Sequence, residues 1–289
     1  MFREFIARVV AVVSAGLSAA AYGQASISLP ATRVAATQPA ATRPAATQAA
    51  PAGQVDPHVH SVLQQLEKKG DAVQDLTADI EWRILDAVID DLQIKSGTLW
   101  FRRDKPHDKF LVRFDKTIVD EQEITKPEEH LFDGEWYTEK REATKTIIRR
   151  QIVRPGEQYD PFKLGEGPFP LPFGQKEAEM LEKFDITYVE PARGDPENSV
   201  HLRLIPKAGS GEIQEKYEEL HFYIDKKMNL PVKVVARQKD EKTVTVFFRN
   251  IKVNSGVAGG RFAIGLPRND PTWEEHVESL PEEGEAPAE

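Results

Sequence analysis

The sequence predicts a mainly β protein of the α+β type, in which one curved antiparallel sheet or barrel carries a few short helices. About ten runs of apolar and β-branched residues recur at regular spacing between turn residues, which is typical of such sheets. Successive runs between residues 97 and 137 also concentrate large aromatic side chains, namely Trp100, Phe101, Phe110, Phe114, Phe132 and Trp136. So much aromatic surface on neighbouring strands has to be buried, either in a core or against an apolar ligand.

The composition narrows the class of protein. The chain has 289 residues, of which 40% are hydrophobic and 29% charged, enough for one large domain with extensions. A net charge of −9 argues against nucleic acid or an anionic membrane as the main partner. The absence of cysteine excludes disulfides, a thiolate nucleophile, Cys-ligated metal and a lipid-modified N-terminal Cys.

Residues 1–23 have the parts of a secretory signal peptide. Arg3 and Arg8 supply positive charge, an apolar run covers residues 9–21, and Ala21-Tyr22-Gly23 fits a small-x-small cleavage site. The apolar run is shorter than the roughly 20 residues of a membrane span. We therefore expect an exported protein that is soluble after cleavage, with an uncleaved anchor as the alternative.

Low-complexity segments flank the predicted domain, which covers residues 55–280. Residues 24–54 are rich in Ala, Thr and Pro, with the near-repeat ATRVAATQ and ATRPAATQ, and predict a disordered linker. The linker is either a plain spacer or a tether that holds the domain away from a membrane. Residues 281–289 are small and acidic and predict a disordered tail.

The domain opens with a helix and continues with strands. Asp56-Pro57 is a helix start, and the apolar residues that follow share one helical face. Apolar and polar residues alternate strictly over residues 76–84, which predicts a strand with one buried face. Further strands are predicted at 97–103, 108–115, both sides of the Asp133-Gly134 turn, 144–153, 184–189, 200–206, 220–225, 231–237 and 243–253.

Residues 154–174 differ from the rest of the domain in composition, because they are rich in proline, glycine and aromatic residues. Five prolines and four glycines exclude a regular strand or a long helix and predict an irregular loop. Its apolar side chains are expected to fold back over the sheet: Tyr159, Phe162, Phe169, Leu171 and Phe173. A short helix is predicted after this loop, over residues 178–184.

No specific catalytic motif is present, so we predict that the protein is not an enzyme and needs no cofactor or metal. The carboxylate pairs Asp90-Asp91, Glu128-Glu129 and Glu218-Glu219 are interpreted as solvated edges. The later histidines are scattered and indicate no triad or metal set: His107, His130, His201, His221 and His276.

Apolar recognition is the chemistry that the pattern favours. Aromatic side chains on a concave sheet face, capped by helices and a loop, make a ligand cavity. Arg102 and Arg103 are adjacent on a strand and face opposite sides, so one can reach carbonyl groups of the helical lid or a ligand head group, unless both are surface charges. The predicted ligand-binding residues are Trp82, Trp100, Phe101, Arg103, Phe110, Phe114, Phe132, Trp136, Phe169, Leu171 and Phe173.

At these residues the sequence resembles the LolA-like family of periplasmic outer-membrane lipoprotein carriers. The resemblance spans about residues 55–267 and rests on the order of several short motifs after the first helix. They are G-x-L-W-x-x-R at Gly97, Leu99, Trp100 and Arg103, an F-x-x-x-F strand, D-G-x-W-Y at Asp133 to Tyr137, L-x-P-K at Leu204 to Lys207, and F-x-x-x-x-P at Phe262 and Pro267.

The resemblance implies an incomplete antiparallel β-barrel with a lid of short helices and a loop over an apolar cavity. It implies a monomeric periplasmic carrier of lipoprotein acyl chains or lipid, served by an inner-membrane lipoprotein-releasing transporter and an outer-membrane acceptor. Arg103 matches the family's lid-closing arginine, and Phe110 approximately matches its aromatic neighbour. The chain departs from the family at Asp104, which replaces a proline, in a longer turn with Pro106, and in segment 154–174.

Two other functions use the same residues differently. An envelope sensor or regulator could use the same lipid-binding fold, but it needs a protein-docking surface or a second domain. A hydrolase is disfavoured because the sequence offers neither a triad nor a metal set.

Overall fold

The computed structural model describes residues 55–105, 107–154, 156–157, 173–267 and 270–280. The predicted signal peptide, linker and acidic tail lie outside the described residues, as do Phe169, Leu171 and most of the proline-rich segment. Within the described residues, no helix is both long enough and apolar enough to cross a membrane.

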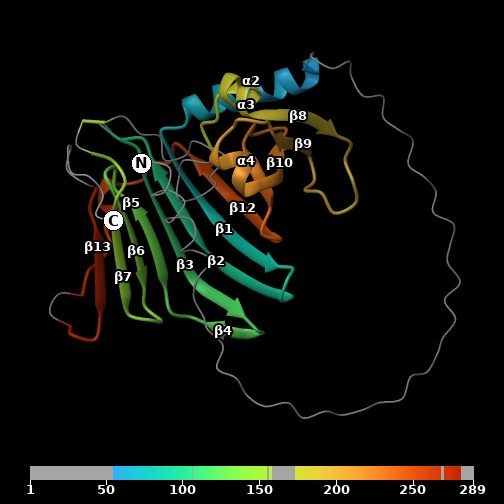
Figure 1. The fold of residues 1–289 in the computed structure, drawn as a ribbon. Helices are drawn as coiled ribbons and strands as arrows, with labels where there is room; N and C mark the ends of the chain where they lie inside the picture. The colour runs from blue at the N-terminus through green and yellow to red at the C-terminus, as the bar shows by residue number, and fades with distance from the viewer. Residues whose placement is uncertain (1–54, 106, 155, 158–172, 268–269, 281–289) are drawn as a thin grey trace, which may run out of the picture.

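The described strands form one open 13-stranded sheet (Figure 1). Its order is β13-β7-β6-β5-β3-β2-β1-β12-β11-β10-β9-β8, with β4 paired to β3. β13 runs parallel to β7, and the other pairs along this path are antiparallel. The strands are β1 Asp75–Asp86, β2 Asp91–Arg102, β3 Lys109–Val119, β4 Gln122–Ile124, β5 Glu128–Phe132, β6 Trp136–Arg141, β7 Thr146–Gln151, β8 Phe184–Val189, β9 Ser199–Pro206, β10 Tyr217–Asp225, β11 Pro231–Gln238, β12 Lys242–Val253 and β13 Glu274–Glu278.

Three α-helices accompany the sheet in the described part of the chain: α2 Pro57–Ala72, α3 Glu177–Lys183 and α4 Glu212–Lys216. A 3-10 turn, η1, covers Gly259–Arg261. Figure 1 shows α2 and α3 together across one end of the strands. The open sheet with short helices confirms the predicted fold class, and it is the arrangement that the LolA-like resemblance implied.

The first helix begins where the sequence indicates. Asp56 is its N-cap, and the Asp56 side chain accepts a hydrogen bond from the His58 backbone N–H at 2.7 Å. The buried residues of α2 fall on one face and enter the main core: Val59, Val62, Leu63 and Leu66. We call the sheet face that packs against α2 the inner face.

Polar contacts join α2 to α3. His60 Nδ1 lies 2.5 Å from Glu177 Oε1, and the Glu67 carboxylate accepts a hydrogen bond of 2.9 Å from the Glu177 backbone N–H. Lys176, the residue before α3, forms ion pairs with Glu67 and Asp71. The two helices therefore form one unit over the sheet.

Most predicted strands are confirmed, and the differences fall in polar sequence. β2 begins at Asp91, six residues before the predicted start, and pairs with β1 in a long hairpin. β4, β13 and α4 were not predicted, because their residues are too polar or too few to give a periodic apolar signal.

Gly97 lies where the backbones of β2 and β3 leave no room for a side chain. A Cβ atom at this position would lie 1.8 Å from the Arg113 carbonyl oxygen. The pairing of β2 with β3 shifts its register between Ser96 and Gly97. The first glycine of the G-x-L-W motif is therefore required by backbone contact rather than by ligand.

Candidate ligand-binding site

The apolar half of the inner face lies on β1, β2, β3 and β8–β12. Five of the predicted ligand-binding aromatics are buried there or at its border with β5: Trp82, Phe101, Phe110, Phe114 and Phe132. Phe110 stacks on Phe132 with ring centroids 6.0 Å apart. Alternation along each strand brings these side chains to one face, as the sequence predicts.

α2 and Phe173 cover this apolar half. The α2 side chains share one core cluster with the inner aromatics, and the Phe173 ring packs edge-on against Phe248 at 5.1 Å. The structure thus describes α2 and the inner aromatics as parts of one buried core. The cavity beneath the helices and its ligand remain predictions.

Trp100 and Trp136 do not belong to the inner face, which corrects the sequence analysis. Trp100 alternates with the inward-facing Phe101 and packs in a separate cluster with Leu111, Leu131 and Phe262. It lines an outer-face groove of about 540 Å³, with the Arg261 guanidinium 4.7 Å from its ring centroid. Trp136 alternates with the buried Tyr137, and Arg149 lies over its ring at 5.2 Å.

Arg103 reaches the end of the helix, as the sequence analysis suggested for one of the two arginines. Arg103 Nε donates to the Val73 carbonyl at 2.8 Å, and Arg103 Nη2 donates to the Gly70 carbonyl at 3.0 Å. A cation at a helix C-terminus satisfies carbonyls that lack intrahelical partners and is favoured by the helix dipole. Arg102 lies on the other face, 3.5 Å from the Val257 carbonyl.

A second side chain fixes the same helix end. Asn254 Nδ2 donates to the Ala72 carbonyl at 3.0 Å, and Asn254 Oδ1 accepts from the Gln74 backbone N–H at 2.7 Å. Arg103 and Asn254 therefore hold the connection between α2 and β1.

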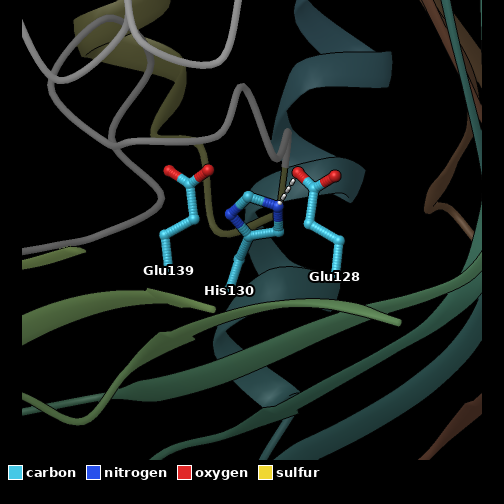
Figure 2. A group of neighbouring side chains, drawn as sticks. All are labelled: Glu128, His130 and Glu139. Carbon is cyan, nitrogen blue, oxygen red and sulfur yellow. Dashed lines mark hydrogen bonds and ion pairs between the residues drawn. The ribbon is translucent and has the colours of Figure 1, made fainter. Parts of the chain in front are cut away.

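The inner face changes character on β5–β7, which we call the polar half. Figure 2 shows Glu128, His130 and Glu139 with their polar groups rising from the strands on one side of the sheet. His130 is completely buried; its Nε2 lies 2.7 Å from Glu128 Oε1 and its Nδ1 lies 2.8 Å from the Tyr137 hydroxyl. Lys95 Nζ, from β2, donates to both Glu128 oxygens at 2.8 Å.

Two further charged groups of the polar half are incompletely paired. Glu139 is 1% exposed and forms an ion pair with Arg141, but both of its carboxylate oxygens accept no hydrogen bond from the described residues. Arg150, 4% exposed, donates from Nε to Glu278 Oε2 at 2.9 Å. Its buried Nη1 has no acceptor among the described residues.

Burial and partners shift the ionisation of this cluster. Burial alone would raise the pKa of Glu128, but the hydrogen bond from His130 and the charge of Lys95 outweigh it and hold that pKa well below its ordinary value of 4.5. Burial, reinforced by the charge of Glu139, raises the pKa of Tyr137 well above its ordinary value. At neutral pH the cluster therefore contains an ionised carboxylate and a neutral phenol.

The donor set does not favour a metal ion. Ligand atoms of Glu128, His130 and Glu139 lie within 4.8 Å of one another, which is a possible geometry. Each carboxylate, however, already neutralises a cation, Lys95 on Glu128 and Arg141 on Glu139. A divalent ion would add two positive charges beside these cations in a buried site, and repulsion at low dielectric is large.

The polar half was not predicted from the sequence. Glu128 was interpreted as a solvated edge and His130 was unassigned, whereas the structure places the partly buried Glu128 and the fully buried His130 together on the inner face. The signal was present in the alternation of β6, where Tyr137, Glu139 and Arg141 share one face opposite Trp136. The aromatic Trp136 suggested the wrong face as the buried one.

Comparison with known proteins gives similar structures at low sequence identity. No family model and no curated protein sequence matches the chain. A conserved uncharacterised protein from Thermus thermophilus superposes with a TM-score of 0.44 at 10% identity, covering 77% of this chain and 99% of that one.

Two other similar structures carry family names. A LolA superfamily protein from Nitrosomonas europaea gives a TM-score of 0.32 at 10% identity, covering 71% of this chain and 97% of that one. The lipoprotein LppX of Mycobacterium tuberculosis gives a TM-score of 0.38 at 9% identity, covering 71% and 99%.

Proposed function

We propose that the protein is a non-enzymatic periplasmic carrier that binds the acyl chains of a lipoprotein or a lipid against its inner face. The observation that carries the proposal is the way α2 completes that face. Its apolar side chains join the inner aromatics in one buried core cluster, while polar contacts at the α2–β1 connection hold the helix end. A ligand would enter by taking the place of the helix side chains.

The free energies of burying the helix side chains and of burying an acyl chain are similar, which supports such an exchange. Burial of Val59, Val62, Leu63 and Leu66 is worth about 1.5–3 kcal/mol for each side chain, on the order of 10 kcal/mol together. An acyl chain gains about 0.8 kcal/mol for each CH₂ removed from water, so a palmitoyl-length chain gains a similar total. Closed and loaded states of nearly equal free energy are what a carrier needs in order to both bind and release.

Arg103 would set the balance between the two states. Its two charge-assisted hydrogen bonds to the end of α2 favour the closed state, at about 1.5–3 kcal/mol for a contact with a charged group. Removing them would favour the open, loaded state. Transfer from an inner-membrane releasing transporter to an outer-membrane acceptor would be the physiological form of this cycle.

The test compares Arg103→Leu with Arg102→Leu. The two arginines are adjacent, but Arg102 faces away from α2 and serves as the matched control. Native mass spectrometry of protein purified from the periplasm, with lipid extraction, identifies what each form carries. Release of the bound ligand to acceptor vesicles is then timed. We expect Arg103→Leu to retain ligand longer than the wild type, and Arg102→Leu to behave like the wild type.

The outcomes separate the candidate functions. A co-purifying acylated peptide supports lipoprotein carriage, and free lipid alone indicates a lipid carrier. Equal release by Arg103→Leu and wild type contradicts the role of Arg103. An empty protein that also fails to bind a palmitoyl probe contradicts carriage altogether and leaves an envelope sensor or regulator as the remaining interpretation.

A further inference from the structure

We infer that the polar half of the inner face is a subsite for a zwitterionic head group that carries a phosphate and a primary amine, as in phosphatidylethanolamine. This inference rests on the proposed function, because it assigns the head group of an amphiphile whose acyl chains occupy the apolar half. It concerns the residues of β5–β7 and not the helix contacts discussed above.

The polar half lies directly beside the aromatic side chains of the inner face. Phe114 on β3 packs edge-on against His130 with centroids 5.8 Å apart, and Lys95 Nζ lies 5.7 Å from the Phe114 ring centroid. Phe110 and Phe132 continue the aromatic row in the other direction. The inner face therefore passes directly from aromatic to charged side chains, which matches an amphiphile lying along it.

The polar half contains buried polar atoms whose hydrogen-bonding capacity the described residues do not fill. Neither oxygen of the buried Glu139 accepts a hydrogen bond from the described residues, although Arg141 forms an ion pair with Oε1, and the buried Arg150 Nη1 lacks an acceptor there. Buried polar groups in native proteins are nearly always satisfied. A ligand ammonium would donate to Glu139, and a ligand phosphate would accept from Arg150.

The spacing of the two residues suits one small ligand. Tyr137 pairs with Arg150, and Glu139 pairs with Ile148, so Glu139 and Arg150 are diagonal neighbours on adjacent strands. Diagonal positions are about 7–8 Å apart at the backbone, within reach of both side chains and of a head group between them. Glu139 and Arg150 alternate with outward-facing residues and share the inner face with Tyr137.

The positive and negative side chains of the polar half are balanced in number. Lys95, Arg141 and Arg150 carry three positive charges, and Glu128, Glu139 and Glu278 carry three negative ones. A zwitterionic head group leaves this balance unchanged, whereas a divalent metal ion adds two positive charges and an anionic lipid adds one negative charge. Uncompensated buried charge is costly.

The experiment uses competition between two lipids with the same acyl chains. Wild-type full-length protein is delipidated and incubated with vesicles of equal phosphatidylethanolamine and phosphatidylglycerol content. The protein is then re-isolated, and its bound lipid is quantified by native mass spectrometry. We expect phosphatidylethanolamine to be enriched about tenfold on the protein, as one well-made charged contact would give.

Variants assign the preference to the polar half. We expect Glu139→Gln to abolish the enrichment, and Arg150→Lys, which keeps the charge but loses the planar fork, to weaken it. Glu129→Gln is the matched control, since Glu129 lies on the outer face with partners Arg113 and Lys140, and it should keep the wild-type preference. Thermal unfolding of each variant shows that it is folded before lipid is added.

The results that would contradict the head-group subsite differ from those that would also contradict the proposed function. Equal uptake of both lipids by the wild type, or an unchanged preference in Glu139→Gln and Arg150→Lys, overturns the head-group subsite and leaves acyl binding intact. No uptake of either lipid overturns both. Binding of soluble phosphoethanolamine at micromolar concentration without any lipid would assign the subsite to a free zwitterion and overturn the lipid source.

Discussion

β10–β12 and β5–β7 present alternate residues to the same inner face, but they bury opposite kinds of side chain. The first group buries Phe222, Val234, Val246 and Phe248 in a continuous apolar core. The second buries His130, Tyr137 and Glu139, which form with the partly buried Glu128 a network of hydrogen bonds and ion pairs. The strands of both groups are antiparallel, so their backbone pairing does not explain the difference.

The difference teaches that burial in this fold does not require an apolar sequence. An apolar core is stabilised by area removed from water, and its members can be exchanged for others of similar volume. A buried polar network depends on each partner being present, because one missing partner leaves a desolvated charge. The two halves should therefore respond differently to mutation and to pH.

The largest effect is expected at Gly97, in β2 beside the border between the two halves. Gly97→Val places a Cβ against the Arg113 carbonyl and should cost more than about 4 kcal/mol, because backbone has to move. Urea unfolding measures the loss. Thr98→Ala, at the neighbouring half-buried position, is the control and should cost less than about 1 kcal/mol. A Gly97→Val protein of wild-type stability would contradict the close approach of β2 and β3.

In the apolar half, the loss of stability on mutation should depend only on the side-chain volume that is removed. Phe222→Ala should destabilise the fold by about 3–5 kcal/mol through lost burial and the cavity left behind. Because no titrating group is removed, the loss should be the same at pH 4 and pH 7. Phe247→Ala removes the same atoms from the outer face, where Phe247 is half-buried, and should cost clearly less. Equal losses at the two positions would contradict the assignment of faces.

The polar half should respond in a pH-dependent way. The pKa of Glu128 is lower in the folded state than its ordinary 4.5, so the unfolded chain binds more protons between these two values. Its contribution to stability is therefore fully present above the ordinary pKa and is lost as pH falls toward the folded pKa. Glu128→Gln should cost about 2–3 kcal/mol at pH 7, and the difference from the wild type should shrink below pH 4.

Glu129→Gln is the control for the preceding prediction. The Glu128 and Glu129 side chains are equally buried, 13% and 14% exposed, but the Arg113 partner of Glu129 is 41% exposed. Solvent screening should keep its cost below about 1 kcal/mol. Chemical denaturation between pH 3 and pH 7 compares the two variants. A constant difference between Glu128→Gln and wild type across this range would contradict the lowered pKa.

The smallest net effect is expected when a whole ion pair is replaced. Lys95→Met alone leaves Glu128 with a weakened set of partners, whereas Lys95→Met combined with Glu128→Leu removes both charges. The double variant should be more stable than Lys95→Met alone, because apolar replacement of a buried pair is often nearly neutral. A double-mutant cycle measures the coupling. Simple additivity would indicate that the two charges act independently.

Sequence reasoning reached the fold and the apolar half because both depend on periodicity. Alternation placed Trp82 on a buried face with Ile80, and helical spacing placed Val59 and Leu66 on one face of the first helix. Trp100 and Trp136 were assigned to the wrong face because aromatic size was taken as a sign of the inner wall. The polar half was missed for a related reason: a buried glutamate is recognisable only when its partners, which lie on other strands, are known.

The contact of Arg103 with α2 shows where local sequence gives a specific contact. Adjacent arginines on a strand point to opposite faces, so at most one of them could reach the helix. The L-x-P-K motif offers a parallel, since Lys207 Nζ donates to the Leu181 carbonyl near the end of α3 at 2.6 Å. Which carbonyls these cations reach depends on tertiary packing and could not be read from spacing.

The pairing of β1 with β12 has a consequence for synthesis of the chain. Trp82 lies opposite Val246, so the first strand of the sheet meets its second neighbour only after most of the domain has been made. Until then a nascent chain presents the β1 edge, with its unpaired backbone groups, to any other extended segment nearby. For a chain that is exported as proposed, protection of the β1 edge would therefore matter until β12 has been translocated and has paired with β1.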